Sequence, residues 1–560
     1  MATLASNTGL WVQNTGAGWL MTSLAPSPVM VSLVQAASML PVFLFALPGG
    51  ALADILDRRI TLIAAQIWIT AAGLLLAVLA ALGLLGAWNV LALTFMIGAG
   101  NAVIFPGWAA ATPELVPDDD VVQAIALNGV GFNIARALGP AAGGFAMAAA
   151  GPAATFSLNA LCFLALLWAL FAWRRPVPPG SDLPAERLPS AMRAALRLAV
   201  SVPIMRAAIL RACAFFFFAS ALWALLPLVV RQGLGLGPAA FGLLLGASGG
   251  GAVMAGVALP AIRDRLSPGK LVLAASLLAY TAMALLSISR HWLLAAVAVV
   301  LFGAAWLAAG TTLGAVAQMT SPAWARARAL GVCQVAFFGA QALGATLWGS
   351  VGSRLGVPIA LALCAATGAL TAAAARRWRL STFAPHRATA WAKKLLARPL
   401  PVAPPPAPAV TSLLHSGSGR VLEAVHYRVD PATREAFLVA MKEVRHVRLR
   451  AGALVWRLYE DVARPDRWIE LWAMESWTDH LREATRLDEP DLAALARAAA
   501  MHRGDAPMEV SRYLNVDPEQ IAHPEHASVG PCHMPGQSEN SDEECEPASN
   551  PDPAGSDLSH

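Results

Sequence analysis

Long apolar runs fill residues 1–376 and constrain this chain more than any other feature. A helix that rises about 1.5 Å per residue needs about 20 mostly apolar residues to cross a bilayer. Backbone groups in lipid must also be hydrogen-bonded within their own segment. The sequence therefore predicts an all-α polytopic membrane protein over this region. About twelve runs are long enough, at residues 3–24, 29–52, 60–82, 88–110, 122–149, 153–173, 209–230, 239–261, 270–288, 292–313, 328–350 and 356–375.

Composition excludes a simple soluble protein and a fibrous or wholly disordered one. Hydrophobic residues make up 57% of the 560 positions and charged residues 13%, whereas soluble domains carry roughly 25% charged residues. The formal net charge is +5, and the arginines lie in loops instead of forming one basic face. We therefore expect the lipid bilayer as a partner and no nucleic acid. The six cysteines show no paired spacing that indicates disulfide bonds.

Lysine and arginine are distributed unequally between alternate loops, and cytoplasmic loops are the ones enriched in these residues. If the N-terminus is inside, the outer loops contain Arg231, Arg290 and Arg354. The bias predicts that both termini are cytoplasmic. The inner loops and the segment after the last run then contain Arg58, Arg59, Arg174, Arg175, Arg187, Arg193, Arg197, Arg263, Arg265, Lys270, Arg326, Arg328, Arg376, Arg377 and Arg379.

The apolar region contains an internal repeat. A shift of about 205 residues aligns the segment 135–140 with the segment 340–345, and each half holds the same number of apolar runs. Such a repeat predicts two parallel six-helix halves. We place them at residues 1–173 and 209–376, joined by a cytoplasmic loop at 174–208.

The C-terminal part of the chain is polar. Proline-rich residues 377–419 are typical of a linker, and the acidic, serine-rich tail 516–560 is predicted to be disordered. Residues 420–515 alternate in the order β-α-β-β-α-β, which predicts a small α+β ferredoxin-like domain. Its predicted elements are strands 421–427, 453–460, 467–475 and 508–514 and helices 433–450, 477–486 and 490–502.

A Gly-Ala-Leu-Ala-Asp-Ile-Leu-Asp-Arg-Arg segment connects the second and third apolar runs. It resembles the signature loop of the major facilitator superfamily, although Ile55 replaces an arginine. Its Asp-Arg-Arg ending is similar to that of one branch, the enterobactin-exporter-like proteins or transmembrane secretion effectors. A plain positively charged inner loop is the alternative. The residues that carry the pattern are Gly50, Asp54, Asp57, Arg58 and Arg59.

Small residues and a proline follow one another in the run 122–149. This spacing allows close helix packing and a kink, and generic packing of small residues is one interpretation. The segment is also similar to a Gly-Pro-x-x-Gly-Gly element of exporters in the superfamily. That resemblance implies that it helps to seal the outer end. The residues are Gly139, Pro140, Gly143 and Gly144.

Arg136 is the charged residue that lies deepest in a predicted span, about 15 residues from its start and hence about 20 Å deep. A charge at this depth is costly and indicates function. Two interpretations stay open: Arg136 binds an anionic group of a substrate, or it is tied to Asn133 or Asn101 as a gate. Other polar residues are predicted to line a central cavity or to bond between helices, namely Asn7, Gln13, Asn14, Gln334 and Gln341.

The resemblance to the exporter branch covers residues 2–376. It implies a secondary active transporter in the bacterial inner (plasma) membrane that exports a small molecule, a siderophore or a drug-like amphiphile, by alternating access. It also implies proton antiport, but the nearest carboxylates are Asp54 and Glu114 at the inner rim of the spans. We expect no cofactor, no enzyme activity and no catalytic residues. The chain begins inside its first run, so an earlier start is a further possibility.

The domain at 420–515 resembles the antibiotic-biosynthesis-monooxygenase-like family in Glu470-Leu471-Trp472, Glu475-Ser476-Trp477 and His480. The resemblance implies a dimeric α+β barrel and hence self-association through this domain. The alternative function is a membrane-tethered monooxygenase-like enzyme or a ligand sensor acting through these residues. No metal site is predicted, because the spacing of four tail residues matches no standard zinc site: His523, His526, Cys532 and His533.

Overall fold

The chain is seen in a computed structural model. The predicted loop 174–208, the linker 377–419 and the tail 516–560 lie largely outside its described residues. The structure describes residues 2–55, 57–111, 117, 120–173, 196, 202–321, 326–378, 380, 404–407, 420–487, 489–503 and 508–515.

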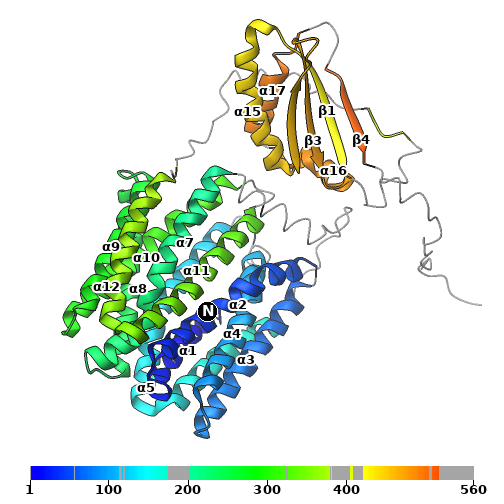
Figure 1. Cartoon of the computed structure of the whole chain (residues 1–560). Helices are drawn as coiled ribbons and strands as arrows, with labels where there is room; N and C mark the ends of the chain where they lie inside the picture. Colours follow the sequence, from blue (N-terminus) through cyan, green and yellow to red (C-terminus); the bar gives the residue numbers. More distant parts are fainter. Residues whose placement is uncertain are drawn as a thin grey trace, which may run out of the picture. The chain divides into compact units, whose positions relative to one another are not determined.

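Helices of the first half pack as a bundle (Figure 1). The 52 residues of the longest helix would extend about 78 Å if straight, well beyond a hydrocarbon core of about 30 Å. Gly151 interrupts this helix with φ 75°, a conformation that glycine adopts without strain. The helices are α1 (Ala2–Leu24), α2 (Pro28–Ile55), α3 (Arg58–Ala81), α4 (Ala87–Ala111) and α5 (Val121–Ala172).

Three helices of the second half begin with proline at a first position, where its missing N–H costs no helical hydrogen bond. A π-helical turn at Val229–Gly233 follows the first of them. The helices are α7 (Pro203–Leu228), α8 (Pro238–Arg263), α9 (Pro268–Ser287), α10 (Trp292–Thr320), α11 (Arg326–Leu355) and α12 (Val357–Ala374).

A described helix covers each predicted apolar run, and the prediction of a multi-pass helical membrane protein is confirmed. Among the described residues, ten helices are long and apolar enough to cross a membrane. Helix α1 is not one of them because polar residues such as Gln13 and Asn14 dilute its hydropathy. Helix α7 begins six residues before the predicted run, because Arg206 and Arg211 lie in its first turns.

Corresponding helices of the two halves begin at a constant spacing along the chain, as the internal repeat predicts. Helix α10 begins 205 residues after α4, and α11 begins 205 residues after α5. Gly356, which separates α11 from α12 with φ 88°, likewise lies 205 residues after Gly151. The two glycines therefore occupy equivalent helix breaks in the two halves.

Residues 420–515 form a layered arrangement in which helices cover a four-stranded sheet of order β2-β3-β1-β4 (Figure 1). Strand β3 is antiparallel to both β1 and β2. Every predicted strand and helix is present, with ends within three residues. The elements are β1 (Val421–Arg428), α15 (Arg434–Ala451), β2 (Val455–Glu460), β3 (Arg467–Met474), α16 (Trp477–Arg486), α17 (Glu489–Ala499) and β4 (Val510–Leu514).

The small unit has its own hydrophobic core, which includes Phe437 and Met441 of α15 and Trp468 and Trp472 of β3. Gly452 is the C-cap residue that follows α15, with φ 117°, a left-handed conformation that favours glycine. An added side chain would also meet the Arg486 guanidinium 2.5 Å away.

A buried polar network surrounds Glu470, whose side chain is fully enclosed. Its carboxylate accepts hydrogen bonds from the Tyr427 hydroxyl (2.8 Å), Arg448 Nε (3.2 Å) and Trp456 Nε1 (3.0 Å). Burial and the neighbouring Glu470 raise the pKa of Tyr427 well above its usual value. Burial lowers the pKa of Arg448, but the carboxylates of Glu470 and Glu483 outweigh it and the net shift is upward. The two carboxylates therefore keep the buried Arg448 guanidinium in its charged form.

Glu470→Gln should destabilise residues 420–515, because the substitution replaces a buried carboxylate that accepts three hydrogen bonds and removes one of the two carboxylates that pair with Arg448. The expected loss is about 3 kcal/mol in the free energy of unfolding, read from faster amide hydrogen exchange in β1 and β3 of the full-length protein. The control is Glu460→Gln, at an exposed ion pair with Arg434, which should leave exchange unchanged. Equal exchange in the two variants would contradict this account of the network.

Candidate functional site

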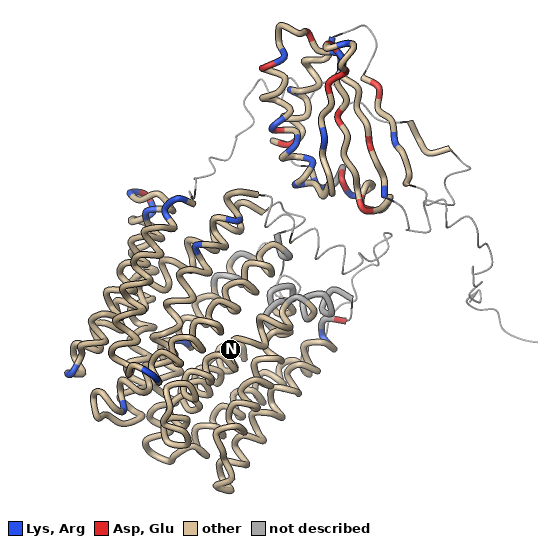
Figure 2. The backbone as a smooth tube through the Cα atoms, in the orientation of Figure 1, with Lys and Arg blue, Asp and Glu red and all other residues tan. Residues whose placement is uncertain are grey.

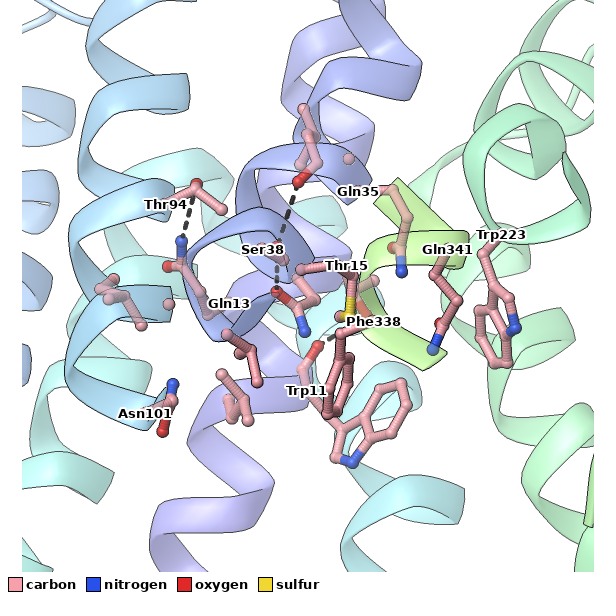
Figure 3. Close-up of a pocket in the computed structure, with 18 of the residues that line it drawn as sticks. Trp11, Gln13, Thr15, Gln35, Ser38, Thr94, Asn101, Trp223, Phe338 and Gln341 are labelled. Atoms are coloured by element: carbon pink, nitrogen blue, oxygen red, sulfur yellow. Dashed lines mark hydrogen bonds between the residues drawn. The ribbon is translucent and has the colours of Figure 1, made fainter. Parts of the chain in front are cut away.

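A cavity of about 300 Å³ lies between the two halves of the bundle. Helices α1, α2, α4 and α5 of the first half and α7, α8, α10 and α11 of the second contribute its walls. Figure 3 shows part of this lining, with Asn101 and Thr94 on the α4 side and Trp223 on the α7 side. Predicted polar residues that line it are Gln13, Asn14, Asn101, Arg136, Gln334 and Gln341.

Side-chain amides and hydroxyls form the polar part of the wall. Gln13 Nε2 donates to Thr94 Oγ1 (3.4 Å), and Asn159 Nδ2 donates to Gln13 Oε1 (3.3 Å), so one glutamine connects α1, α4 and α5. The Ser38 hydroxyl donates to Asn14 Oδ1 (3.4 Å) between α2 and α1. Gln13 and Asn14 therefore line the cavity and also bond between helices, so both predicted roles hold in the geometry.

Aromatic side chains form a continuous part of the wall. Ring centroids lie 6.0 Å apart between Trp11 and Trp223, 5.6 Å between Trp223 and Trp306, and 4.9 Å between Trp306 and Phe216. Phe337 extends the row at 5.3 Å from Phe216. Tilted and edge-to-face pairs at these separations are favourable. The row connects α1 of the first half to α7, α10 and α11 of the second.

Arg136 lies near the middle of the first segment of α5, residues 121–150, and its side chain is 5% exposed. Its Nε and Nη2 have no hydrogen-bond partner among the described residues. Asn133 donates instead to the Gly129 carbonyl of its own helix (2.9 Å) and is not among the lining residues. Asn101 lines the same cavity as Arg136. A buried charge without a protein partner is costly.

Glycines bring helices together at one end of the bundle, where α1 ends and α2 begins, which we call the Leu24 end. A side chain on Gly144 of α5 would meet the Gly242 backbone of α8 at 2.8 Å. A side chain on Gly349 of α11 would meet Ser32 of α2 at 1.8 Å. Glycine is therefore required where the two halves touch at the Leu24 end.

The Gly-Pro element also packs within the first half. A side chain on Gly139 would meet the Cβ of Trp11 at 2.6 Å, and one on Gly143 would meet the Cα of Val12 at 3.0 Å. A side chain on Gly242 of α8 would meet the Pro140 carbonyl oxygen at 2.4 Å. This segment of α5 is thus pressed between α1 and α8.

The signature loop is described in part. Gly50, Asp54 and Arg58 lie in helical backbone, but their side chains fall outside the described ones. Asp57 caps α3 by accepting the Ile60 N–H (3.1 Å). Arg59 donates to the Phe171 carbonyl at the end of α5 (3.0 Å), where a cation is favourable.

Described charges gather at the helix ends (Figure 2). The end opposite the Leu24 end carries the larger number, and we call it the Arg59 end. Charges at the Leu24 end are Arg231, Arg290 and Arg354. Charges at the Arg59 end include Arg59, Arg206, Arg263, Arg265, Lys270, Arg376 and Arg377.

Several functional positions carried too weak a sequence signal to be singled out. Arg211 is buried in α7 and donates to the carbonyls of Ala375 (3.0 Å) and Gly269 (3.1 Å). Arg231 donates to the hydroxyls of Thr22 (2.8 Å) and Ser23 (2.9 Å), a bond between the halves at the Leu24 end. Arg211 is the third residue of the predicted run 209–230 and Arg231 follows its last residue, and neither position indicates contacts that are distant in sequence.

One described group has the composition of a metal site: Glu423, His480 and Glu483, whose ligand atoms lie within 4.8 Å of one another. Glu483 also accepts from Arg448 (2.9 Å) and Trp472 (3.3 Å), and Glu423 pairs with His480. The carboxylates therefore already have partners, which fits a structural ion-pair network better than a metal centre.

Family comparison agrees with this geometry. The model of the family described as transmembrane secretion effector matches residues 1–520. The enterobactin exporter EntS of Salmonella typhimurium is 28% identical over 331 residues, which cover 57% of this chain and 76% of that protein. EntS of Escherichia coli O1:K1 is 28% identical over 339 residues, covering 59% and 78%. These homologues are transporters and not enzymes.

Solved transporters share the fold at low sequence identity. An auto-inhibited peptide transporter of the POT family superposes with a TM-score of 0.55 at 14% identity, covering 69% of this chain and 98% of that one. A bacterial homologue of the human lysosomal transporter Spinster, inward-facing and unoccupied, gives 0.54 at 15%, covering 67% and 96%. The nucleoside transporter NupG gives 0.56 at 10%, covering 67% and 98%.

Gln13→Leu should lower the melting temperature of the purified protein, because it leaves the buried Asn159 amide without its partner. The expected cost is about 1–3 kcal/mol, measured by thermal unfolding in detergent. Asn89→Leu is the matched control, since its exposed amide contacts a loop carbonyl. Equal melting temperatures for the two variants would show that the network contributes nothing.

Proposed function

The chain belongs to the transmembrane secretion effector family, and from this premise we propose that it exports a small molecule by alternating access. The observation that carries the proposal is the cavity between the two halves, together with the glycine contacts between the halves at the Leu24 end. A transporter of the major facilitator type works by rocking its halves around such a site. The arrangement fits the state that receives cargo from the Arg59 end.

The proposed topology has twelve spans. The ten apolar helices become twelve when α1 is added and α5 is counted as two crossings separated at Gly151. The charge distribution supports a cytoplasmic Arg59 end and hence two cytoplasmic termini. The Leu24 end then faces outward, and the protein resides in the bacterial inner membrane.

The proposed cargo is a siderophore or a drug-like amphiphile. Relatives named enterobactin exporters support the first class. Arg136 and the amide-lined wall are its proposed contacts, and the Gly-Pro element is the proposed seal. Proton antiport stays a prediction, since none of the described lining residues is acidic and the side chains of Asp54 and Glu114 lie outside the described ones.

We propose that residues 420–515 form a ferredoxin-like accessory domain that supports self-association. The sheet order β2-β3-β1-β4 and the element order β-α-β-β-α-β support that assignment. A tethered enzyme or sensor is the competing role for this domain.

A disulfide across the Leu24 end should abolish export. Pro28 Cβ lies 3.4 Å from the Cβ position of Gly352, close to the separation of about 3.5–4.5 Å in disulfides. Oxidation of Pro28→Cys with Gly352→Cys would hold α2 against α11 and prevent outward opening. Export is read as the compounds retained by cells with the locked chain, compared with cells lacking the protein and cells with the unmodified chain.

Reduction of the disulfide should restore export, and each single-cysteine variant should export normally under oxidising conditions. Full cross-linking with unchanged export would refute an alternating-access mechanism for this chain.

Deletion of residues 420–560 separates the transporter from its rival. A transporter should retain at least partial export, because the cavity and the contacts between the halves lie within residues 2–376. The measurement is efflux from loaded cells at matched membrane expression. Complete loss of activity from a correctly inserted truncated chain would favour the enzyme or sensor.

A further inference from the structure

We propose that the cavity selects an oxygen-rich aromatic anion, and this inference rests on the proposed export function. Of the two proposed cargo classes, the inference favours the siderophore over the drug-like amphiphile, since many drug-like amphiphiles are cations or neutral molecules. Three features of the cavity wall carry it: a buried charge, buried donors and a row of rings.

The charge is the guanidinium of Arg136. Its side chain lines the cavity, and two of its three nitrogens lack a partner among the described residues. None of the described lining residues is acidic. A guanidinium in a medium of low dielectric constant attracts an anion strongly and repels a cation. A carboxylate or phenolate of the cargo would provide the missing counter-charge.

Among the described lining residues, the buried side-chain atoms that lack a hydrogen-bond partner are all donors. Besides those of Arg136, they are the indole Nε1 atoms of Trp11 and Trp223, both buried and without a partner among the described residues. The lining acceptors Gln13 Oε1, which is buried, and Asn14 Oδ1, which is partly buried, already receive hydrogen bonds. Each unpaired buried donor costs free energy that an acceptor would recover. Cargo oxygens beside the charged group meet this requirement.

The rings determine the remainder of the cargo. Trp11 and Trp223 belong to the continuous aromatic row that ends at Phe337, and both line the cavity. Flat aromatic groups pack against such faces at offset or edge-on angles. A volume of about 300 Å³ is at the small end of ligand sites, which fits a group of a few rings.

Three matched probes test the inference with the purified full-length chain: 2-naphthoate, 2-naphthamide and 2-naphthylmethylammonium. They share one ring system and differ in charge. Equilibrium binding at neutral pH should rank naphthoate at least roughly tenfold above naphthamide, with the ammonium weakest. Equal binding of the three, preference for the ammonium, or no binding of naphthoate would overturn the proposal.

Variants connect the preference to Arg136. Arg136→Gln should weaken naphthoate binding roughly 10- to 100-fold while naphthamide binding, which also reports a folded cavity, changes little. Arg136→Lys should keep the preference for the anion. Arg290→Gln makes the same chemical change at an exposed arginine outside the cavity lining and should leave naphthoate affinity intact. Unaltered naphthoate affinity in Arg136→Gln would refute the assignment.

Failure of this inference and of the export function are distinguishable. If the chain exports a cation and the disulfide at the Leu24 end abolishes that export, the export function would be supported and the anion preference overturned. The opposite outcome is also possible to recognise. If the chain prefers naphthoate, but cells with the disulfide-locked chain and cells with the unlocked chain retain the same compounds, the binding site would be supported and the export function contradicted.

Discussion

The buried guanidinium of Arg136, whose Nε and Nη2 have no partner among the described residues, is the constraint around which the membrane part of this chain is organised. A charge near the middle of a span is stable where it faces the bundle interior or water, and here it lines a cavity between the halves. Its helix cannot move aside, because Gly139, Gly143 and Gly144 press that segment against α1 and α8. The tight packing thus holds the charge at the boundary where the halves separate.

The same contacts explain how a fixed charge is compatible with movement. Glycine lets the halves meet over small backbone surfaces at the Leu24 end, as Gly349 meets Ser32, and such contacts contain few interlocking side chains. Arg231 adds hydrogen bonds to Thr22 and Ser23 there. Rocking open would separate these contacts between the halves.

Much of the fold could be predicted because lipid imposes long apolar runs and an internal repeat leaves paired signals such as Gly151 and Gly356. The start of α7 could not, since the buried Arg211 is satisfied by carbonyls of α9 and the turn after α12 that are distant in sequence. Gln13, Asn14 and Arg136 could be proposed as cavity residues from polarity inside apolar runs. The bond from Asn159 to Gln13 spans 146 residues, and only packing reveals it.

Aromatic residues show the limit of sequence interpretation most clearly. Trp11, Trp223 and Trp306 are equally compatible with a membrane-interface belt, and their common row follows from the helix arrangement alone. A density map of the full-length chain with bound 6-bromo-2-naphthoate is the most direct test of the account. We expect its carboxylate at the Arg136 guanidinium, with the rings beside Trp11 and Trp223. Probe density outside the cavity, or Arg136 paired with a carboxylate of the chain itself, would contradict it.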